Sequence, residues 1–424
     1  MLKLLGLKQP VVLIVLTDII AFILLYYYKK PADHYILLTG LLVISLIITT
    51  YFIIVKRRLG DEYLFLIVSM LVSMGFAMIY RLDKYMGSRQ VVWFAAGIIL
   101  FFLSYTFFLK IKILEKLMLY YIVVSVLLFG ATLVLGQSIK GSTNWIFIGG
   151  YSFQPSEVIK IIFVFTLACF FKRSDQVIFG SIRLGFEKLG RLYRLAFMSV
   201  SFMFMGFLVL QREWGTTLLL FLIYISLLYV LDNNTVFFLI NTAAAAAGGV
   251  AGALFVNHIK VRIDIWLNPW ADIAGKGYQV TQSLFAMGSG GFFGTGIGMG
   301  RPDLIPEAGT DFIFAAICEE MGIFGGAAVV LLYFILTYRG IKIALSVKDV
   351  FIKTVALGLT CMFGFQTFII IGGVIKLIPL TGITLPFISY GGSSLTTSFI
   401  ALGILQAISQ ISSEGERSEE IAGE

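Results

Sequence analysis

Apolar runs of about twenty residues recur along almost the whole of this chain, and they limit its fold more than any other feature. A helix needs about 20 apolar residues to cross the hydrocarbon core of a bilayer, where the backbone must satisfy its own hydrogen bonds. Only 13% of the residues are charged, against roughly 25% in soluble domains. We therefore expect an all-α polytopic membrane protein. The twelve predicted spans cover about residues 11–28, 36–55, 64–80, 91–109, 117–136, 156–171, 196–210, 215–231, 235–256, 312–337, 351–374 and 392–411.

The net charge of the chain is +8, which in a soluble protein would suggest a nucleic-acid partner. In a membrane protein, positive charge faces anionic headgroups and gathers on the cytoplasmic side, so we predict a membrane partner and no nucleic acid. The distribution of Lys and Arg favours cytoplasmic termini. This orientation places all five tryptophans and four loop segments on the outer side; the segments are 81–90, 136–156, 257–311 and 378–394.

The outer segment 257–311 is polar enough to leave the hydrocarbon, yet it contains apolar and glycine-rich stretches. Irregular backbone at membrane depth is tolerated only where protein or water covers it. We therefore expect this segment to lie across the mouth of an outward cavity. Its glycines lack the GxGxxG spacing and a Walker lysine, which argues against nucleotide binding. An anion-binding concavity and a tight helical hairpin both remain open.

Positive side chains collect on the predicted outer side. Scattered interfacial cations are one interpretation, and recognition of a dianionic group such as a pyrophosphate is the other. The set consists of Arg81, Lys84, Arg89, Lys140, Arg212, Arg262, Lys276 and Arg301.

Several acidic residues lie at or inside predicted spans, among them Asp18 in the first span, for which the sequence names no partner. Asp311 falls in the first turn of the span 312–337, at the outer side, where it could act as a base. Glu319 and Glu320 lie about 12 Å deeper on other helix faces, so we expect them to bond to neighbouring helices. Glu157 stands three residues before Lys160, a spacing that permits an ion pair, although intramembrane charges also mark function. Glu213, next to Arg212, has the same two interpretations.

Four motifs occur in an order that resembles the SEDS family of FtsW, RodA and SpoVE, over about residues 64–411. The resemblance implies a SEDS-type helical bundle with a ten-span core at 64–411. Two additional transmembrane helices within 1–63 would precede this core, and an acidic cytoplasmic tail, 412–424, expected to be disordered, would follow it. The motifs are QPSEVIK, WLNPWADIAGKGYQVTQSLFAMGSGGFFGTGIGMG, PEAGTDFIFAAICEEMGIFG and TGITLPFISYGGSS.

The resemblance implies a peptidoglycan glycosyltransferase that polymerises lipid II, an undecaprenyl-pyrophosphate disaccharide-peptide, at the outer face of the bacterial plasma membrane. Its role would be in division, elongation or sporulation. Family members usually work with a class B penicillin-binding protein, a transpeptidase. The family's essential aspartate corresponds to Asp311, and its transmembrane glutamate and lysine correspond to Glu157 and Lys160.

In the mechanism that this implies, Asp311 deprotonates the 4-hydroxyl of the acceptor sugar, which attacks the anomeric carbon of the donor. Cations stabilise the departing pyrophosphate, with Arg262 and Lys276 as first choices. Mg²⁺ or Mn²⁺ is a candidate cofactor, and the ligands of any metal are unknown. The expected substrate-binding residues are Glu157, Lys160, Arg262, Lys276, Arg212 and Arg81.

The chain departs from the family at three points. Gly309 stands where histidine is common in PEAHTDF, Asn144 stands where many members have arginine, and QREWGT replaces QPDxGT. A lipid II flippase is the alternative function, and a scaffold that recruits the transpeptidase is a third. Transporters commonly contain internal repeats, and none is visible here, which favours the polymerase.

Overall fold

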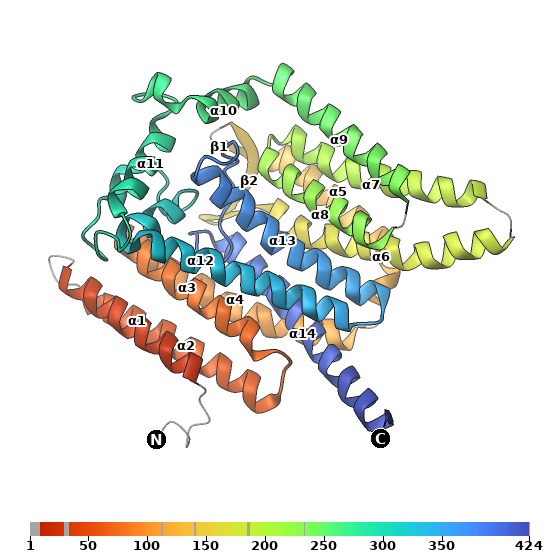
Figure 1. Cartoon of the computed structure of the whole chain (residues 1–424), viewed down its shortest axis with the longest axis horizontal. Coiled ribbons are helices and arrows are strands. Elements are labelled where there is room, and N and C mark those ends of the chain that lie inside the picture. The colour runs from red at the N-terminus through yellow and green to blue at the C-terminus, as the bar shows by residue number, and fades with distance from the viewer. Residues whose placement is uncertain are drawn as a thin grey trace.

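A computed structural model describes residues 9–28, 34–111, 113–139, 141–184, 187–232 and 234–423. The chain is predominantly helical (Figure 1). Its α-helices are α1 Gln9–Tyr28, α2 His34–Arg57, α3 Glu62–Leu82, α4 Lys84–Lys110, α5 Met118–Leu135, α6 Pro155–Leu184, α7 Glu187–Leu210, α8 Trp214–Leu231, α9 Thr235–Phe255, α10 Asn257–Leu267, α11 Tyr278–Gly290, α12 Ile313–Ser346, α13 Val350–Val374 and α14 Gly392–Gly423. Short 3-10 helices, η2 Leu114–Lys116, η3 Pro269–Asp272 and η4 Pro302–Leu304, occupy some of the connections.

The polytopic all-α class is confirmed. Within the described residues, eleven helices are long and apolar enough to cross a membrane. The remaining predicted span, 156–171, is helical too, inside α6, whose first turns carry Glu157 and Lys160. One expectation is wrong: residues 412–423 of the acidic tail continue helix α14 instead of being disordered.

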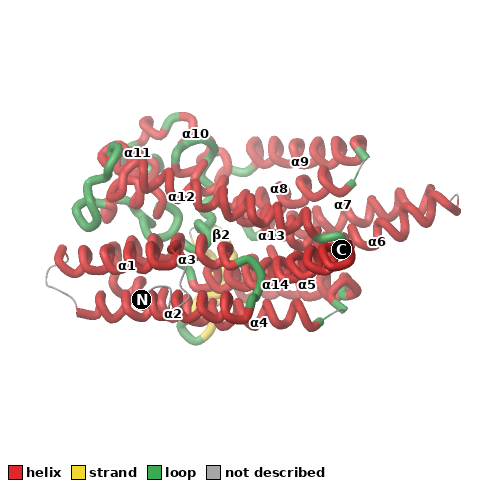
Figure 2. Tube along the Cα trace, turned by 60° about the horizontal axis from the view of Figure 1, so that its bottom comes forward, coloured by secondary structure: helices red, strands yellow, loops and turns green. Residues whose placement is uncertain are grey.

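The helix α3 lies at the centre of the bundle. Most of its residues are buried, and it packs against α1, α2, α4 and α12. A helix that is apolar on all sides suits such a position. The two additional N-terminal helices, α1 and α2, form a hairpin along one side of the bundle, against α3 and α4 (Figures 1 and 2). In Figure 2 the loops and short helices around α10 and α11 gather at one end of the molecule.

A three-stranded antiparallel sheet follows α5 at this same end. It consists of β1 Gln137–Ile139, β2 Ser142–Ile148 and β3 Tyr151–Phe153, in the order β1-β2-β3. Gly149 and Gly150 form the β2–β3 turn with φ of 58° and 82°, as a two-residue hairpin requires. These strands were not predicted from hydropathy, although the GG pair between apolar runs is a hairpin signal.

Helix α12 is broken at Gly322, which has φ 68° and ψ −171°. Its interrupted backbone pairs with the loop that follows α11: the amides of Thr295 and Gly296 donate to the carbonyls of Glu319 and Glu320 over 2.9 and 3.0 Å. In the other direction, the amide of Ile323 donates to the carbonyl of Gly291 over 2.9 Å. The glycine-rich stretch is therefore a loop that packs against α12 and completes its backbone hydrogen bonds.

The same loop binds two acidic side chains of α12. The amide of Gly298 donates to Glu320 Oε2 over 2.9 Å, and the amide of Arg301 donates to Glu319 Oε1 over 2.7 Å. A Cβ on Gly294 would lie 2.2 Å from the Glu320 carbonyl oxygen, so only glycine fits there. The glycine-rich amides thus bind anions, as one interpretation predicted, but the anions are carboxylates of the chain itself.

Candidate active site

A cavity of about 510 Å³ lies at the end of the bundle that carries α10, α11 and the sheet. Six separate segments line it: Arg89 and Trp93 of α4, residues 142–157, which include β2, β3 and the start of α6, residues 212–216 before and within α8, Arg262 of α10, the turn 307–311 before α12, and residues 381–394 before α14. Loops that lie far apart in the sequence, on the predicted outer side, therefore form one site.

Asp311 and Arg262 both lie beside Gly382 in this cavity. A Cβ on Gly382 would lie 3.4 Å from Asp311 Oδ2 and 3.5 Å from Arg262 Nη2, and Gly382 itself has φ 73°. Arg262 is held by its Nη1, which donates to the carbonyls of Leu380 and Thr381 over 3.0 and 2.6 Å. Burial lowers the pKa of Arg262, and the charge of Asp311 opposes this shift. Since the ordinary pKa of arginine exceeds 12, the guanidinium stays charged.

The turn that carries Asp311 is tied to the segment before α14. The amide of Tyr390 donates to the Gly309 carbonyl over 2.8 Å, and Ser389 Oγ donates to the Thr310 carbonyl over 2.7 Å. A Cβ on Gly309 would meet only Leu82 and a methionine sulfur, both at 3.9 Å. The backbone here does not require glycine, so the departure from histidine leaves open space beside the turn.

Glu157 and Lys160 form the ion pair that their spacing permits. Lys160 Nζ lies 2.8 Å from Glu157 Oε2 and 3.0 Å from Gln366 Oε1 of α13, while Thr397 Oγ1 of α14 donates to Glu157 Oε2 over 3.2 Å. Both charged side chains are buried. Glu157 lines the cavity, whereas Lys160 lies behind it. The pair joins α6 to α13 and α14 directly beneath the cavity wall.

Glu213, between α7 and α8, is a buried acid of the cavity that the sequence left ambiguous. Its Oε1 accepts hydrogen bonds from Gln154 Nε2 and Ser156 Oγ, both at 3.1 Å. Its Oε2 has no hydrogen-bond partner among the residues that the structure describes. Burial raises the pKa of Glu213, and the hydrogen bonds from Ser156 and Gln154 oppose the shift. No pattern in the sequence distinguishes such a buried acid from an exposed loop glutamate.

The raised pKa predicts how stability depends on pH. The folded state binds the proton of Glu213 more tightly than the unfolded state, so its contribution is complete below about pH 4.5 and is lost as pH rises through the raised value. Glu213→Gln should therefore raise the melting temperature in detergent more at pH 8 than at pH 5. Glu307→Gln, an exposed acid at the rim, is the control. A Glu213→Gln effect that is equal at both pH values would contradict the prediction.

The remaining predicted substrate-binding residues lie in three different surroundings. Arg212 lines the cavity, is exposed, and has φ 61°. Lys276 lies outside it, in a small adjoining pocket that Arg262 also lines. Arg81 belongs to another network, since its Nε lies 3.0 Å from Glu320 Oε1 and its Nη2 donates to the Gly300 carbonyl over 2.9 Å. Glu320 thus bonds to a neighbouring helix, α3, as predicted. Lys140 lies outside the described residues.

Aromatic side chains form a further part of the cavity wall: Trp93, Trp145, Trp214, Phe147 and Tyr390. Ring faces carry partial negative charge and suit the polarised C–H groups of a sugar ring. A cavity with aromatic faces, arginines and a carboxylate can hold an anionic carbohydrate.

The expected divalent cation, Mg²⁺ or Mn²⁺, would need a group of ligand side chains in the cavity. Within the described part of the chain, no group of three or more His, Cys, Asp and Glu side chains could hold a metal ion. The cation Arg262 lies beside Gly382 with Asp311, and its charge disfavours a second positive charge there. The described residues of the cavity therefore do not fit a preformed metal site.

The chain matches the family described as a cell cycle protein, FtsW/RodA/SpoVE, over residues 59–414. It is 35% identical to the peptidoglycan glycosyltransferase RodA of Mycobacterium tuberculosis, with 82% of this chain and 78% of that protein covered. Its identity to the stage V sporulation protein E of Bacillus subtilis is 34%, with 84% and 99% covered.

Two solved structures resemble the fold. The crystal structure of Thermus thermophilus RodA has a TM-score of 0.61 and 25% identity, and the match covers 82% of this chain and 96% of that one. A chain of a peptidoglycan synthase complex that coordinates polymerization and crosslinking has a TM-score of 0.68 and 26% identity, with 83% and 98% covered. The family match begins after α2, so α1 and α2 lie outside it.

Proposed function

The chain belongs to the FtsW/RodA/SpoVE family, and we propose that the cavity around Asp311 is where it polymerises lipid II. The protein is a peptidoglycan glycosyltransferase, the activity named for its relatives. The observation that carries the assignment of the site is the position of Asp311 and Arg262 together beside Gly382 in the cavity.

In the proposed reaction, Asp311 accepts the proton of the acceptor 4-hydroxyl as its oxygen attacks the donor anomeric carbon. The bond between this carbon and the phosphate oxygen breaks, and the undecaprenyl pyrophosphate leaves with the electron pair. Arg262 and Arg212 balance the charge that develops on the pyrophosphate. Arg262 is already oriented by two carbonyls, so it needs little reorganisation. The aromatic wall would hold the sugar rings.

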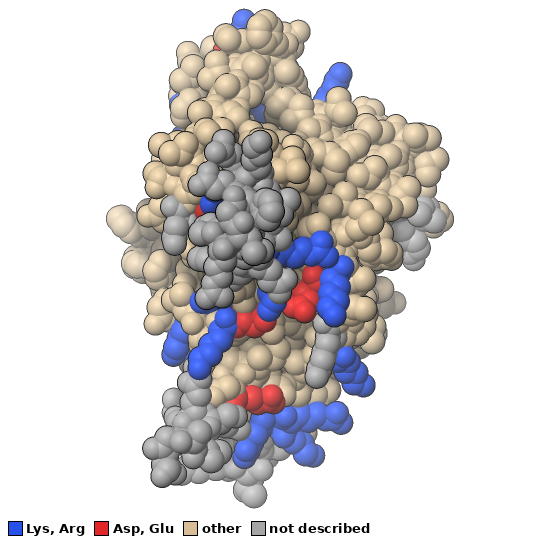
Figure 3. All heavy atoms as spheres, turned by 90° about the vertical axis from the view of Figure 1, so that its right-hand side faces the viewer, with Lys and Arg blue, Asp and Glu red and all other residues tan. Residues whose placement is uncertain are grey.

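We propose that the cavity faces outward and that the opposite end is cytoplasmic. Figure 3 views that opposite end, and on it Lys and Arg gather together with a few acids, while the visible flanks are mostly uncharged. A basic surface at one membrane boundary is typical of the cytoplasmic side. The similar chain in a synthase complex that coordinates polymerization and crosslinking supports a transpeptidase, a class B penicillin-binding protein, as the partner.

The test is direct. Purified full-length protein with its cognate transpeptidase, incubated with labelled lipid II, should produce glycan chains that resolve as a ladder on a gel. The same protein in vesicles should not increase the transfer of labelled lipid II between leaflets. Transfer without chains, with any partner supplied, would replace the polymerase by the flippase.

A further inference from the structure

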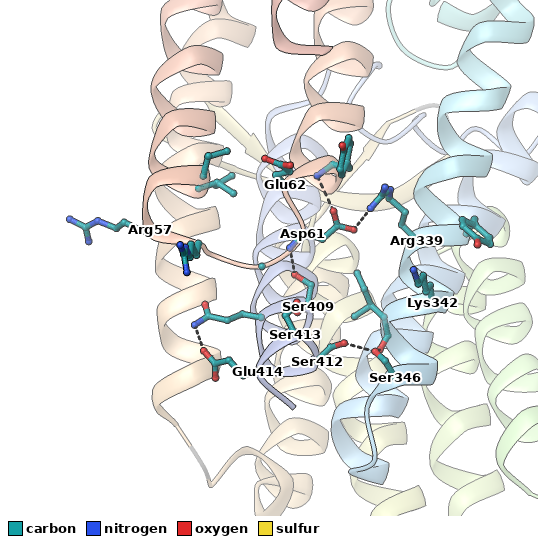
Figure 4. Close-up of a pocket in the computed structure, with 18 residues that line it drawn as sticks. Arg57, Asp61, Glu62, Arg339, Lys342, Ser346, Ser409, Ser412, Ser413 and Glu414 are labelled. Carbon is teal, nitrogen blue, oxygen red and sulfur yellow. Dashed lines mark hydrogen bonds and ion pairs between the residues drawn. The ribbon is translucent and has the colours of Figure 1, made fainter. Parts of the chain in front are cut away.

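A second cavity, of about 700 Å³, lies at the other end of the bundle, about 40 Å along α12 from Asp311. It lies where α2 turns into α3, beside the C-terminal halves of α12 and α14 (Figure 4). The reaction proposed above uses none of its residues.

Hydrogen bonds fix the turn that forms one wall of this cavity. The amide of Asp61 donates to Ser409 Oγ over 2.9 Å, and Gln406 Nε2 donates to the carbonyls of Leu59 and Asp61 over 2.6 and 3.1 Å. Gly60 has φ 87°, and a Cβ there would lie 2.2 Å from Ser409 Oγ. The turn between α2 and α3 is thus docked on α14, and the cavity is a fixed feature of the fold.

The opposite wall is fixed by Arg339 of α12. Its Nη1 lies 2.5 Å from Asp61 Oδ2, and its guanidinium lies 4.3 Å from the centre of the Tyr63 ring. Figure 4 shows Asp61 and Arg339 pointing toward each other across the cavity, with Lys342 beside Arg339 on α12. The other carboxylate oxygen of Asp61, Oδ1, is also engaged, because it accepts a hydrogen bond from the amide of Tyr63 over 3.0 Å.

The acids of the cavity already have partners, whereas two of its cations do not. Asp61 is bound by Arg339, Glu62 Oε2 accepts from Tyr51, and Glu414 Oε1 accepts from Gln410. Within the described part of the chain, the side chains of Arg58 and Lys342 line the cavity and form no hydrogen bond or ion pair. The side chain of Arg57 extends outward from the rim in Figure 4. The side chains that remain available to bind a ligand are therefore cations, which suits a phosphate group.

Apolar side chains line the cavity next to these cations: Ile54, Val55, Ile343 and Tyr338. Both kinds of lining occur where the apolar spans end, which is the depth of lipid headgroups. Basic pockets between transmembrane helices at the cytoplasmic boundary bind anionic headgroups. We propose that this cavity binds an anionic phospholipid, with the glycerophosphate headgroup between Arg58 and Lys342, beside Arg339, and the start of the acyl chains along Val55 and Tyr338.

The test measures lipid binding by the full chain without lipid II, so it does not depend on the proposed function. Native mass spectrometry in detergent compares phosphatidylglycerol with phosphatidylcholine of the same acyl chains. The double variant Arg58→Asn/Lys342→Gln should bind phosphatidylglycerol about 5- to 30-fold more weakly, since each cation near a headgroup contributes about 1 kcal/mol. Asparagine is used because Arg58 has φ 53°. Lys110→Gln, an exposed lysine at the end of α4, is the matched control and should not change binding.

Two results would overturn the proposal. Equal phosphatidylglycerol affinity of the wild type and the double variant would show a general surface effect. Displacement of the lipid by sn-glycerol 3-phosphate at equal concentration would identify a soluble phosphate compound as the ligand. If the double variant melts at a lower temperature than the wild type, the single variant Lys342→Gln is measured instead. It should bind phosphatidylglycerol about fivefold more weakly than the wild type.

Discussion

Asp311→Asn should reduce glycan synthesis by about 10²- to 10⁴-fold, the usual contribution of a general base. Asparagine keeps the shape of the side chain and its place beside Gly382, but it cannot accept the proton of the attacking hydroxyl. Because Arg262 is held by the carbonyls of Leu380 and Thr381, its position should not change. Chain formation from labelled lipid II with the partner transpeptidase is the measurement.

Asp303→Asn is the matched control for this variant. Asp303 lies in the same segment before α12, is exposed, and does not line the cavity. It should leave both the rate and the chain length unchanged. The melting temperatures of the two variants should equal that of the wild type, so that the loss is assigned to chemistry. Long chains from Asp311→Asn at the wild-type rate would remove Asp311 as the base.

Lys160→Met should lower the free energy of unfolding by about 3–5 kcal/mol, the cost of leaving one buried charge without its partner. Glu157 would then keep only Thr397 as a hydrogen-bond donor among the side chains described above. Gln366 would also lose the bond that its oxygen accepts. Thermal unfolding of the purified protein in detergent measures the effect, and Lys110→Met, at an exposed site, is the control.

The double variant Glu157→Gln/Lys160→Met distinguishes an ion pair from a general packing role. It removes both charges, so it should recover much of the stability that Lys160→Met loses. Equal instability of the single and double variants would show that the volume and hydrogen bonds of Lys160 matter more than its charge. If the double variant folds but polymerises slowly, the pair also positions the cavity wall through Glu157.

Hydropathy predicted the spans because their length and apolarity are local properties of the sequence. It missed the sheet 137–153, whose strands are short and whose stability depends on neighbouring helices. It also ended the span from 312 at residue 337, although α12 continues to Ser346. That extension, at the end of the bundle opposite the Asp311 cavity, carries Arg339 and Lys342, and charged residues are not recognised by hydropathy as part of a span.

The site was harder to predict, because membership in the cavity depends on which way each side chain points. Arg262 and Arg81 are both cations of the predicted outer side, but Arg262 faces Gly382 while Arg81 pairs with Glu320. Composition and spacing contain no information on this difference. The assignment of Asp311 came from its motif, and the separation of Asp311 from the deeper glutamates came from helix geometry alone. The motif and the helix geometry both agree with the position of Asp311 in the cavity wall.

The break in α12 also has a consequence for biogenesis. Until residues 291–296 dock, the helix has unpaired amide and carbonyl groups around Gly322, which would be costly in lipid. The loop precedes α12 in the chain, so it is translated and translocated first and is present when α12 enters the membrane. In the sequence, Asp311 lies between the loop 291–296 and the break at Gly322, the two parts of the chain that dock. Asp311 is therefore expected to reach its position only after this loop and the helix have assembled, so an incompletely inserted protein would lack the proposed base.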